Sequence, residues 1–254
     1  MKVTFLGTGT SQGVPVIACT CEVCTSADPR DNRLRCSIFI ETNEGNVIID
    51  TGPDFRQQML REGIKQLDAV LYTHEHKDHI AGMDDIRAFN FFQKKDMPLY
   101  LSEHVEEALR REFAYVFAAE KYPGIPLVNL HRITEKPFSL LGQTVVPIAV
   151  THYKMPVFGY RFGDFCYVTD AKTIPPEELE KMKGCKIIVL NALRRESHTS
   201  HLTLDEAVAI LEYLKPEQAY LTHISHQLGL HAEVEKELPS FIKIAYDGLV
   251  IECN

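Results

Sequence analysis

Histidine and aspartate are concentrated in one short segment, His74-Glu75-His76-Lys77-Asp78-His79. Imidazole and carboxylate groups bind divalent metal ions, and four such groups within six residues would crowd one another around a single ion. The spacing therefore predicts two ions, with His74 and His76 on one and Asp78 and His79 on the other. Imidazole with few carboxylates favours Zn²⁺, while Mn²⁺ and Fe also suit these ligands. An isolated surface histidine is usually only solvated, so the compact H-x-H-x-D-H string is what indicates a metal site.

Three later apolar segments end as the one before His74 does, with a threonine followed by a potential ligand. These endings are Thr151-His152, Thr169-Asp170 and Thr222-His223. Strand ends carry side chains into a crevice on a rigid base, so the recurring ending predicts one convergent site. We expect His152 and His223 to complete the two ligand sets. Asp170 would bridge the ions, because a shared carboxylate reduces repulsion between ions about 3.5–4 Å apart.

A second group of potential ligands lies near the N-terminus and consists of Cys19, Cys21 and Cys24. Their C-x-C-x-x-C spacing offers three thiolates, one fewer than a tetrahedral Zn²⁺ site needs. A site with four protein ligands and no open position is structural, and it would hold the polar loop at about 13–35. Free thiols or a disulfide are the alternatives. The remaining cysteines outside this loop, apart from Cys36, lie in apolar strand patterns that predict core positions: Cys166, Cys185 and Cys253.

The elements that must position these residues alternate between strands and helices along the whole chain. The hydrophobic patterns predict strands at 3–6, 37–42, 47–50, 69–73, 144–151, 158–162, 165–169, 185–190 and 218–222, and over 242–251 around an Asp-Gly turn. Helices are predicted at 54–62, 80–92, 103–117, 175–183, 203–214 and 231–238, with a capping box formed by Thr203 and Glu206. The chain has no low-complexity segment and no Gly/Ser-rich linker. We therefore expect one domain over 1–254, in which helices are layered on sheets.

The composition is that of an ordinary globular protein and excludes several other classes. Of the 254 residues, 45% are hydrophobic and 24% are charged, which excludes long-range disorder, a collagen-like repeat and a coiled coil. No apolar run is long enough for a transmembrane helix, and the N-terminus has no secretory h-region. We expect a cytoplasmic protein with free or metal-bound thiols and no membrane partner. The net charge of −8 argues against a dedicated nucleic-acid binder.

The H-x-H-x-D-H segment, followed in order by His152, Asp170 and His223, resembles the signature of the metallo-β-lactamase superfamily. The resemblance implies an α/β fold, the four-layer αβ/βα sandwich, with a binuclear metal site along one edge. Asp50 matches the early aspartate of this family, which orients a histidine ligand. The flavodiiron oxygen reductases of the superfamily have glutamate where this chain has His76, so a redox di-iron site is not expected.

Further segments resemble the PhnP-like cyclic-phosphate phosphodiesterases over nearly the whole chain. They are Phe5–Ser11, Cys19–Cys24, Asp28–Arg30, Gly82–Arg87 and Thr222–His226. This resemblance implies two catalytic divalent ions, Zn or Mn, and one structural Zn whose fourth ligand is His226. Cys36 could replace His226, and His231 is a weaker candidate. The resemblance also implies that His201 is the general acid for the leaving oxygen and that the protein is a homodimer.

The resulting hypothesis is a metal-dependent phosphodiesterase that acts on a small (cyclic) phosphodiester. A hydroxide activated between the ions would attack phosphorus, with Asp78 and His201 as catalytic residues. The same ligands would serve a cyclic ribosyl phosphate, a cyclic nucleotide or a linear diester. The alternatives are an acyl hydrolase for thioesters, lactones or β-lactams, a tRNA 3′-processing nuclease, which the acidic charge disfavours, and a non-enzymatic accessory protein of quinone-cofactor biosynthesis. His198, Arg194 and Arg195 are expected to be solvated loop residues.

Overall fold

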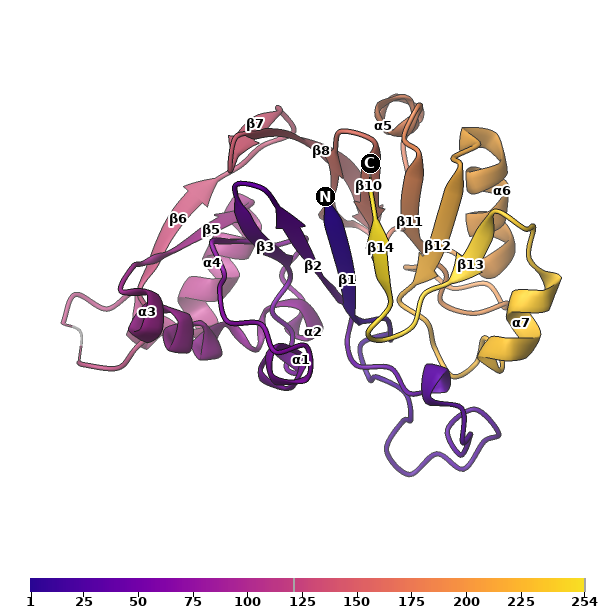
Figure 1. Ribbon diagram of the computed structural model, residues 1–254, viewed down its shortest axis with the longest axis horizontal. Helices are drawn as coiled ribbons and strands as arrows, with labels where there is room; N and C mark the ends of the chain where they lie inside the picture. Colours follow the sequence, from indigo (N-terminus) through magenta and orange to yellow (C-terminus); the bar gives the residue numbers. More distant parts are fainter. Residues whose placement is uncertain (121, 254) are drawn as a thin grey trace.

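The chain folds into two seven-stranded sheets that face each other and carry helices on their outer surfaces (Figure 1). A computed structural model describes residues 1–120 and 122–253. The arrangement is the four-layer α/β sandwich that the resemblance implies, so the expected fold class is confirmed. Within the described residues, no helix combines the length and apolar character needed to span a bilayer.

The first sheet contains the N-terminal strands and the last strand of the chain. Its order is β14-β1-β2-β3-β4-β5-β6, with β3 to β6 parallel and the other pairs antiparallel. The strands are β1 (Lys2–Gly7), β2 (Ser37–Thr42), β3 (Gly45–Ile49), β4 (Ala69–Leu71), β5 (Met97–Leu101), β6 (Val128–Arg132) and β14 (Val250–Glu252). The two chain ends therefore lie side by side in one sheet (Figure 1).

The second sheet repeats this plan with its parallel part at the other end of the chain. Its order is β13-β12-β11-β10-β9-β8-β7, and β10 to β13 are parallel. The strands are β7 (Phe138–Leu140), β8 (Gln143–His152), β9 (Met155–Phe162), β10 (Phe165–Val168), β11 (Ile187–Asn191), β12 (Gln218–Thr222) and β13 (Ile242–Ile244). Parallel strands point their carboxyl ends to one edge, which brings distant parts of the sequence together there.

Alternation along the strands divides the apolar residues among three cores. In β1, Val3 and Phe5 face the core between the sheets, whereas Leu6 faces the helices outside the first sheet. In β2, Ile38 and Ile40 face inward and Phe39 faces outward. Successive side chains of a strand point to opposite faces, so strands buried on both sides read as continuous apolar runs.

Helices cover the outer face of each sheet. On the first sheet they are α1 (Phe55–Arg61), α2 (Lys77–Ile80), η2 (Met83–Ile86), α3 (Arg87–Gln93), α4 (Glu103–Glu112) and η3 (Ala114–Val116). On the second they are α5 (Pro176–Met182), α6 (Leu204–Leu214) and α7 (His231–Glu237), and η1 (Pro29–Asp31) lies in the N-terminal loop. The expected capping box at α6 is present, with Thr203 and Glu206 each bonding the other's backbone N–H.

Three expectations about elements are wrong. The helix expected over 103–117 ends at Glu112 and is followed by a 3-10 turn. The continuous helix expected over 80–92 is interrupted, because α2 ends at Ile80 and a 3-10 turn precedes α3. The strand expected over 242–251 is two strands in different sheets, since β13 pairs with β12 and β14 pairs with β1. The turn at Asp247 therefore crosses the sandwich. Its carboxylate accepts hydrogen bonds from the backbone N–H groups of Thr8 and Leu34, which fixes the crossing to the first sheet.

Candidate metal centres

The histidines and aspartates singled out in the sequence converge at one edge of the sandwich. His74 follows β4, His152 ends β8, Asp170 follows β10 and His223 follows β12. A second set comes from the short helix α2, which carries Asp78 and His79. We call these residues, together with His76, the His/Asp cluster.

The backbone turns sharply where several of these strands end. Asp50, Asp170 and His223 have φ angles of 65°, 57° and 57°, in the left-handed region that residues other than glycine rarely adopt. Such strain is characteristic of functional sites, where it re-aims side chains. Close packing at Gly52 supports the same region, because a Cβ there would lie 2.1 Å from the backbone oxygen of Asp78.

One half of the His/Asp cluster consists of Asp78, His79, Asp170 and His223. Their potential ligand atoms all lie within 4.8 Å of one another. His79 Nε2 lies 3.1 Å from Asp78 Oδ2 and 3.4 Å from Asp170 Oδ1. His223 Nε2 lies 3.2 Å from the other oxygen of Asp170. This half can hold one ion.

The other half consists of His74, His76 and His152. The ring centroids of His74 and His76 are 4.8 Å apart, and those of His76 and His152 are 4.9 Å apart. His74 Nε2 lies 3.8 Å from Asp170 Oδ2. Asp170 therefore stands between the two halves, in the position that a bridging carboxylate would need.

Several ring nitrogens of the cluster lack hydrogen-bond partners, as expected for ligands of divalent cations. His74 Nε2, His79 Nε2 and both ring nitrogens of His223 are buried without a hydrogen-bond partner. Buried polar atoms are normally paired, so several orphaned nitrogens at one place indicate a missing ligand. The metallo-β-lactamase fold itself implies divalent metal ions, and this cluster has the donors for them.

Hydrogen bonds on the far side of the rings fix the direction in which the free nitrogens point. His79 Nδ1 donates to Asp50 Oδ2 at 2.7 Å, and Asp50 in turn accepts from the N–H and hydroxyl of Thr73. His152 Nδ1 donates to the Ser200 carbonyl oxygen at 2.8 Å. Partners of this kind hold the tautomer and orientation of metal-ligating histidines.

The carboxylates and the histidines of the His/Asp cluster shift one another's pKa values. Burial lowers the pKa of His74 well below its usual value and also lowers that of His152, which favours the neutral form that binds metal. Although burial opposes it, the charges of Asp78, Asp170 and Asp50 hold the pKa of His79 well above its usual value. The neighbouring histidines overcome the burial of Asp170 and keep its pKa well below the usual range.

His201 lies beside the cluster, on the loop between β11 and α6. It is 7% exposed, and its Nδ1 is 4.0 Å from Asp170 Oδ2. Its ring centroid is 4.4 Å from that of His152 and 4.7 Å from that of His223. Burial, with help from His223, lowers the pKa of His201 to about 2. The structure thus places His201 next to both halves, where it could act on a bound substrate or serve as a further ligand.

The other polar residues of this loop lie farther out. His198 is half-buried, with its ring 5.2 Å from that of His201 and its Nδ1 near the Ser200 hydroxyl. Arg195 pairs with Glu237 at the surface. Arg194 donates to the side chain of Gln227 and to backbone oxygens.

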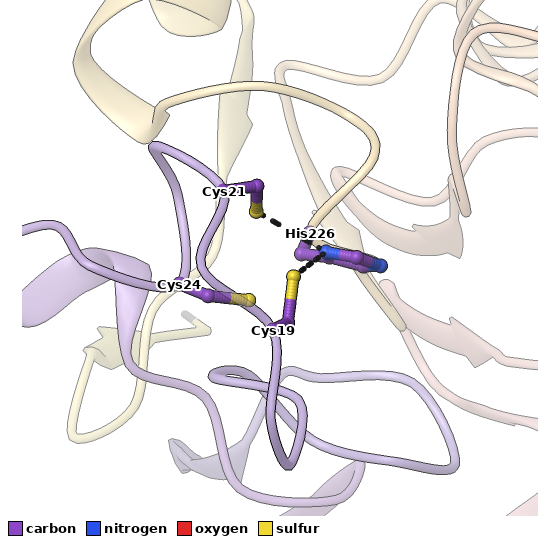
Figure 2. A group of neighbouring side chains, drawn as sticks. All are labelled: Cys19, Cys21, Cys24 and His226. Atoms are coloured by element: carbon purple, nitrogen blue, oxygen red, sulfur yellow. Dashed lines mark hydrogen bonds between the residues drawn. The ribbon is translucent and has the colours of Figure 1, made fainter.

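The three cysteines of the N-terminal loop meet His226, and we call these four residues the Cys/His cluster (Figure 2). The sulfur atoms of Cys19 and Cys21 lie 3.4 and 3.3 Å from His226 Nδ1. A hydrogen bond from the backbone N–H of Cys24 and the His226 ring lower the pKa of the Cys21 thiol to about 6. Three sulfurs and one imidazole nitrogen at this spacing have the donor chemistry of a closed tetrahedral zinc site.

The two alternatives for the fourth position lie elsewhere. Cys36 is buried, with its sulfur 3.2 Å from the Tyr167 hydroxyl and 3.1 Å from that of Thr222. His231 accepts from the buried Arg33 guanidinium at 3.1 Å. Of the three cysteines expected in the core, Cys166 and Cys185 are buried and Cys253 is half-buried.

One short segment connects the two clusters. His223 belongs to the first cluster and His226 to the second, and Ile224 between them pairs with the start of the N-terminal loop. Ile224 donates its N–H to Thr8 and accepts from the N–H of Thr10. The backbone that ends β12 therefore positions a ligand for each cluster.

Thr73 and Ser200 are the supporting residues to which the sequence assigned no role. Thr73 links Asp50 to His74, since its hydroxyl lies 2.8 Å from Asp50 Oδ2 and 2.9 Å from His74 Nδ1. The sequence feature that could have indicated this role is the threonine that recurs directly before each potential ligand at a strand end. Ser200 acts through its carbonyl oxygen, so its side-chain type carries no signal.

Comparison with known families identifies the part of the chain that carries the His/Asp cluster. A model described as "Beta-lactamase superfamily domain" matches residues 45–224. The Cys/His cluster lies outside this range at both ends. The family match therefore does not cover the Cys/His cluster.

Curated relatives match the chain over part of their own length. A Porphyromonas gingivalis protein named "Octanoyltransferase" is 40% identical over 98% of this chain and 51% of that protein. "Coenzyme PQQ synthesis protein B" of Methylobacterium radiotolerans is 33% identical over 34% of each chain. The chain thus spans a third to about half of the length of these curated relatives.

Solved structures match over the whole length. A crystal structure described as "a New Diphosphatase from the PhnP Family" has a TM-score of 0.93 and 44% identity, covering 100% of this chain and 98% of the other. Zn²⁺-bound PqqB from Methylobacterium extorquens covers 100% of both chains with a TM-score of 0.78, but at 18% identity this likeness shows the fold alone. The family model and the PhnP-family structure together show that this chain belongs to the metallo-β-lactamase superfamily, as a PhnP-like member.

Proposed function

We propose that this chain is a binuclear-metal-dependent phosphodiesterase that hydrolyses a small phosphodiester, either cyclic or linear. The family and its diphosphatase member support the coarser statement that it is a metal-dependent hydrolase. The observation that carries the proposal is Asp170, which stands between the two halves of the cluster, close to His74, His79 and His223, whose buried ring nitrogens lack partners. A phosphorus centre is favoured over a carbonyl because the 44% identical PhnP-family relative is described as a diphosphatase.

The two halves of the His/Asp cluster would each hold one ion. The first ligand set is His74, His76, His152 and Asp170, and the second is Asp78, His79, Asp170 and His223. Bound divalent ions of this type, Zn or Mn here, stabilise charge on phosphoryl oxygens and lower the pKa of water, so that a hydroxide nucleophile exists near neutral pH.

The protein's own groups perform the remaining tasks. Asp50 and the Ser200 carbonyl hold the rings of His79 and His152 in one orientation through Nδ1, which leaves Nε2 directed at the metals. Asp78 would help to hold the second ion through its carboxylate. His201 holds a proton for the departing oxygen, since its Nδ1 faces Asp170 and leaves Nε2 for the substrate. A phosphate anion bound beside this ring would favour its protonated form.

The Cys/His cluster would hold a structural zinc. All four positions of a tetrahedral ion are taken by protein atoms, so no position remains open for substrate. The ion would order a loop that has one short 3-10 helix and few buried apolar side chains.

Acyl hydrolysis is the alternative with a specific observation in its favour. The 40% identical Porphyromonas gingivalis relative is named an octanoyltransferase, and octanoyl transfer is chemistry at an acyl carbon. That protein is about twice as long as this chain, so the matched half need not carry that chemistry. A thioester or ester would use the same ions to polarise its carbonyl oxygen.

Metal analysis paired with a substrate comparison tests the proposal. The purified protein should contain close to three divalent ions per chain, with two lost in His76→Ala and one lost in Cys21→Ser. His104→Ala is the matched control, because His104 is an exposed histidine of α4 outside both clusters. The same preparation should hydrolyse bis(p-nitrophenyl) phosphate much faster than p-nitrophenyl octanoate.

The other outcomes separate the rival functions. Faster cleavage of the octanoate ester would select the acyl alternative. Metal in the Cys/His cluster alone, with no hydrolysis of either compound, would overturn the enzymatic proposal and favour the accessory role suggested by the partial likeness to PQQ synthesis protein B.

A further inference from the structure

A cavity of about 540 Å³ opens beside the His/Asp cluster. It is lined by His76, by His152 and by Ser200, whose carbonyl oxygen orients His152, together with four residues that the mechanism does not use: Tyr153, Lys154, Met155 and Thr199. The two histidines place this cavity directly next to one half of the metal centre. A group attached to the reacting phosphorus would extend into it.

The most exposed part of the cavity wall is the turn that joins β8 to β9. His152 pairs with Met155 across this hairpin, which leaves Tyr153 and Lys154 as its two turn residues. The Tyr153 side chain is 63% exposed. At the rim of a cavity beside the His/Asp cluster, an exposed aromatic ring offers its flat face to a ligand.

The backbone conformation of this turn is unfavourable for tyrosine. Tyr153 has a φ of 57°, in the left-handed region where the first residue of a tight hairpin turn is usually glycine or asparagine. A bulky residue at such an angle stores strain, and strained residues cluster where function requires them. The strain lies one residue beyond the proposed ligand His152.

Neighbouring side chains hold the ring and complete a site for a flat group. The Lys154 ammonium lies over the Tyr153 ring, 5.5 Å from its centroid, an arrangement that favours one orientation of the phenol. Met155 adds an adaptable thioether to the same wall. Thr199 and Ser200 place hydroxyl groups on the opposite strand-end loop, and no carboxylate lines the cavity among the described residues. The combination of an aromatic face with hydroxyl donors suits a heterocyclic ring.

We propose that Tyr153 is a specificity-determining residue that stacks on a flat ring carried by the substrate, so that the preferred substrate is a phosphodiester bearing a nucleobase. This inference rests on the proposed phosphodiesterase function and names the substrate class for the same site. The phosphorus binds at the His/Asp cluster, and the base lies in the cavity against the hairpin turn. Stacking of a base on an aromatic side chain is tolerant of sequence, because every base has a flat face.

Two cyclic diesters with the same reacting ring test this proposal. Adenosine 2′,3′-cyclic monophosphate and glycerol 1,2-cyclic phosphate both contain a five-membered cyclic phosphodiester, but only the first carries a base. The variant is Tyr153→Asn, because asparagine suits the left-handed turn and removes the ring. The ratio of kcat/KM for the adenosine compound to that for the glycerol compound should fall about tenfold, mainly through KM, which is the usual effect of losing one base stack.

Matched variants exclude a general structural effect. Tyr153→Phe keeps the ring and should keep the substrate ratio. Tyr213→Ala is the surface control, because Tyr213 is 55% exposed on α6 and has Lys183 over its ring, yet it lies outside the cavity. Metal content is measured for every variant, since Tyr153 follows His152. An equal fall for both substrates, or an unchanged ratio, would overturn the inference.

Binding of the product separates this inference from the proposed function. Calorimetry with adenosine 3′-monophosphate and with glycerol 1-phosphate measures the cavity without turnover. A protein that cleaves neither diester but binds the adenosine product about tenfold more weakly as Tyr153→Asn would refute the phosphodiesterase and keep the base site. A protein that cleaves both diesters with no dependence on Tyr153 would refute the base site and keep the phosphodiesterase.

Discussion

The His/Asp cluster and the Cys/His cluster are built by opposite means. Residues of the first cluster stand at strand ends or on α2, and His74, His79, Asp170 and His223 are at most 1% exposed. Residues of the second are half-buried, and three of them stand on an irregular loop. The first cluster is assembled by two sheets, whereas the second lies where the chain has little regular structure (Figures 1 and 2).

This contrast shows in which cluster the fold itself orients the ligand side chains. Hydrogen bonds orient the rings of the first cluster: His79 donates to Asp50, His152 donates to the Ser200 carbonyl oxygen, and the Thr73 hydroxyl contacts His74 Nδ1. In the second cluster, the side chains of Cys19 and Cys21 contact the ring of the fellow ligand His226, and the Val16 N–H donates to the sulfur of Cys24. Loss of a ligand should therefore impair chemistry in the first cluster and loop order in the second.

The largest effect is expected from His201→Ala, which separates a catalytic group from a metal ligand. If His201 supplies the proton for the leaving oxygen, turnover of an alkyl diester should fall on the order of 10²–10⁴-fold with the metal content unchanged. The measurements are kcat and metal stoichiometry on one preparation. Loss of an ion would instead assign His201 to the ligand group that it forms with His152 and Asp170. A wild-type rate with an alkyl leaving group would remove the role altogether.

Replacement of the Asp50 carboxylate tests whether the two clusters bind their metals independently. Asp50→Asn should weaken metal binding in the His/Asp cluster about 10–100-fold, because the amide holds the His79 ring less firmly than a carboxylate does. Zinc in the Cys/His cluster should not change. Asp31→Asn is the reciprocal variant, since Asp31 is buried under the N-terminal loop and accepts from Ser26 and from the His231 N–H. Equal weakening of both clusters by either variant would mean that the two sites are not independent.

Cys21→Ser tests whether the second cluster supports only its own loop. The variant should lose one ion, and the rate of limited proteolysis within 13–28 should rise about tenfold, since loops open locally when their ties are lost. The diesterase rate should fall far less than in His201→Ala. Cys253→Ser is the control, because that cysteine lies at the opposite end of the chain, in neither cluster. A matching loss of activity would show that His226 transmits the change to His223 through their shared segment.

The sequence predicted the first cluster well because its ligands lie at the ends of strands with clear apolar patterns. Each of those strands was found near its expected range, and the recurring threonine marked where it stops. The strands β5, β6 and β7 were missed. Polar or charged residues interrupt β6 and β7, as in Val128–Arg132, where none of the side chains is fully buried, whereas β5 is a short strand with a proline at its second position. The periodic signal is weak at such edges, because one face packs against little.

Other features depend on tertiary context that a local pattern does not contain. The 242–251 segment has one apolar pattern, yet its two ends join different sheets. Asp247 accepts hydrogen bonds from the backbone N–H groups of Thr8 and Leu34, which lie next to β1 and β2 of the first sheet. The fourth ligand of the cysteines came from the family resemblance and not from spacing. The hairpin turn at Tyr153 was hard to predict from the sequence, because tyrosine and lysine are not the usual residues of a tight turn.

The smallest expected effect concerns the pair Arg33 and His231, which we call the loop base. Hydrogen bonds between protein groups, and no metal ligand, hold the N-terminal loop there. Arg33 is 4% exposed, and its guanidinium donates to Thr8, to the Ala245 carbonyl and to His231 Nδ1. The His231 ring must therefore keep Nδ1 free of a proton. Burial, together with the charges of Arg33 and Arg30, lowers the pKa of His231 to about 4.

This lowered pKa has a definite consequence for stability. A histidine in the unfolded chain titrates near 6.5, so between about pH 6.5 and pH 4 the unfolded state binds a proton that the folded state refuses. The free energy of unfolding should fall as the pH drops through this window, by on the order of 2 kcal/mol from His231 alone. Urea unfolding at pH 7.5 and pH 4.5 measures this difference. His231→Gln, which can still accept from Arg33 but does not titrate, should make the two values closer, and an unchanged pH dependence would show that the loop base does not rely on the neutral ring.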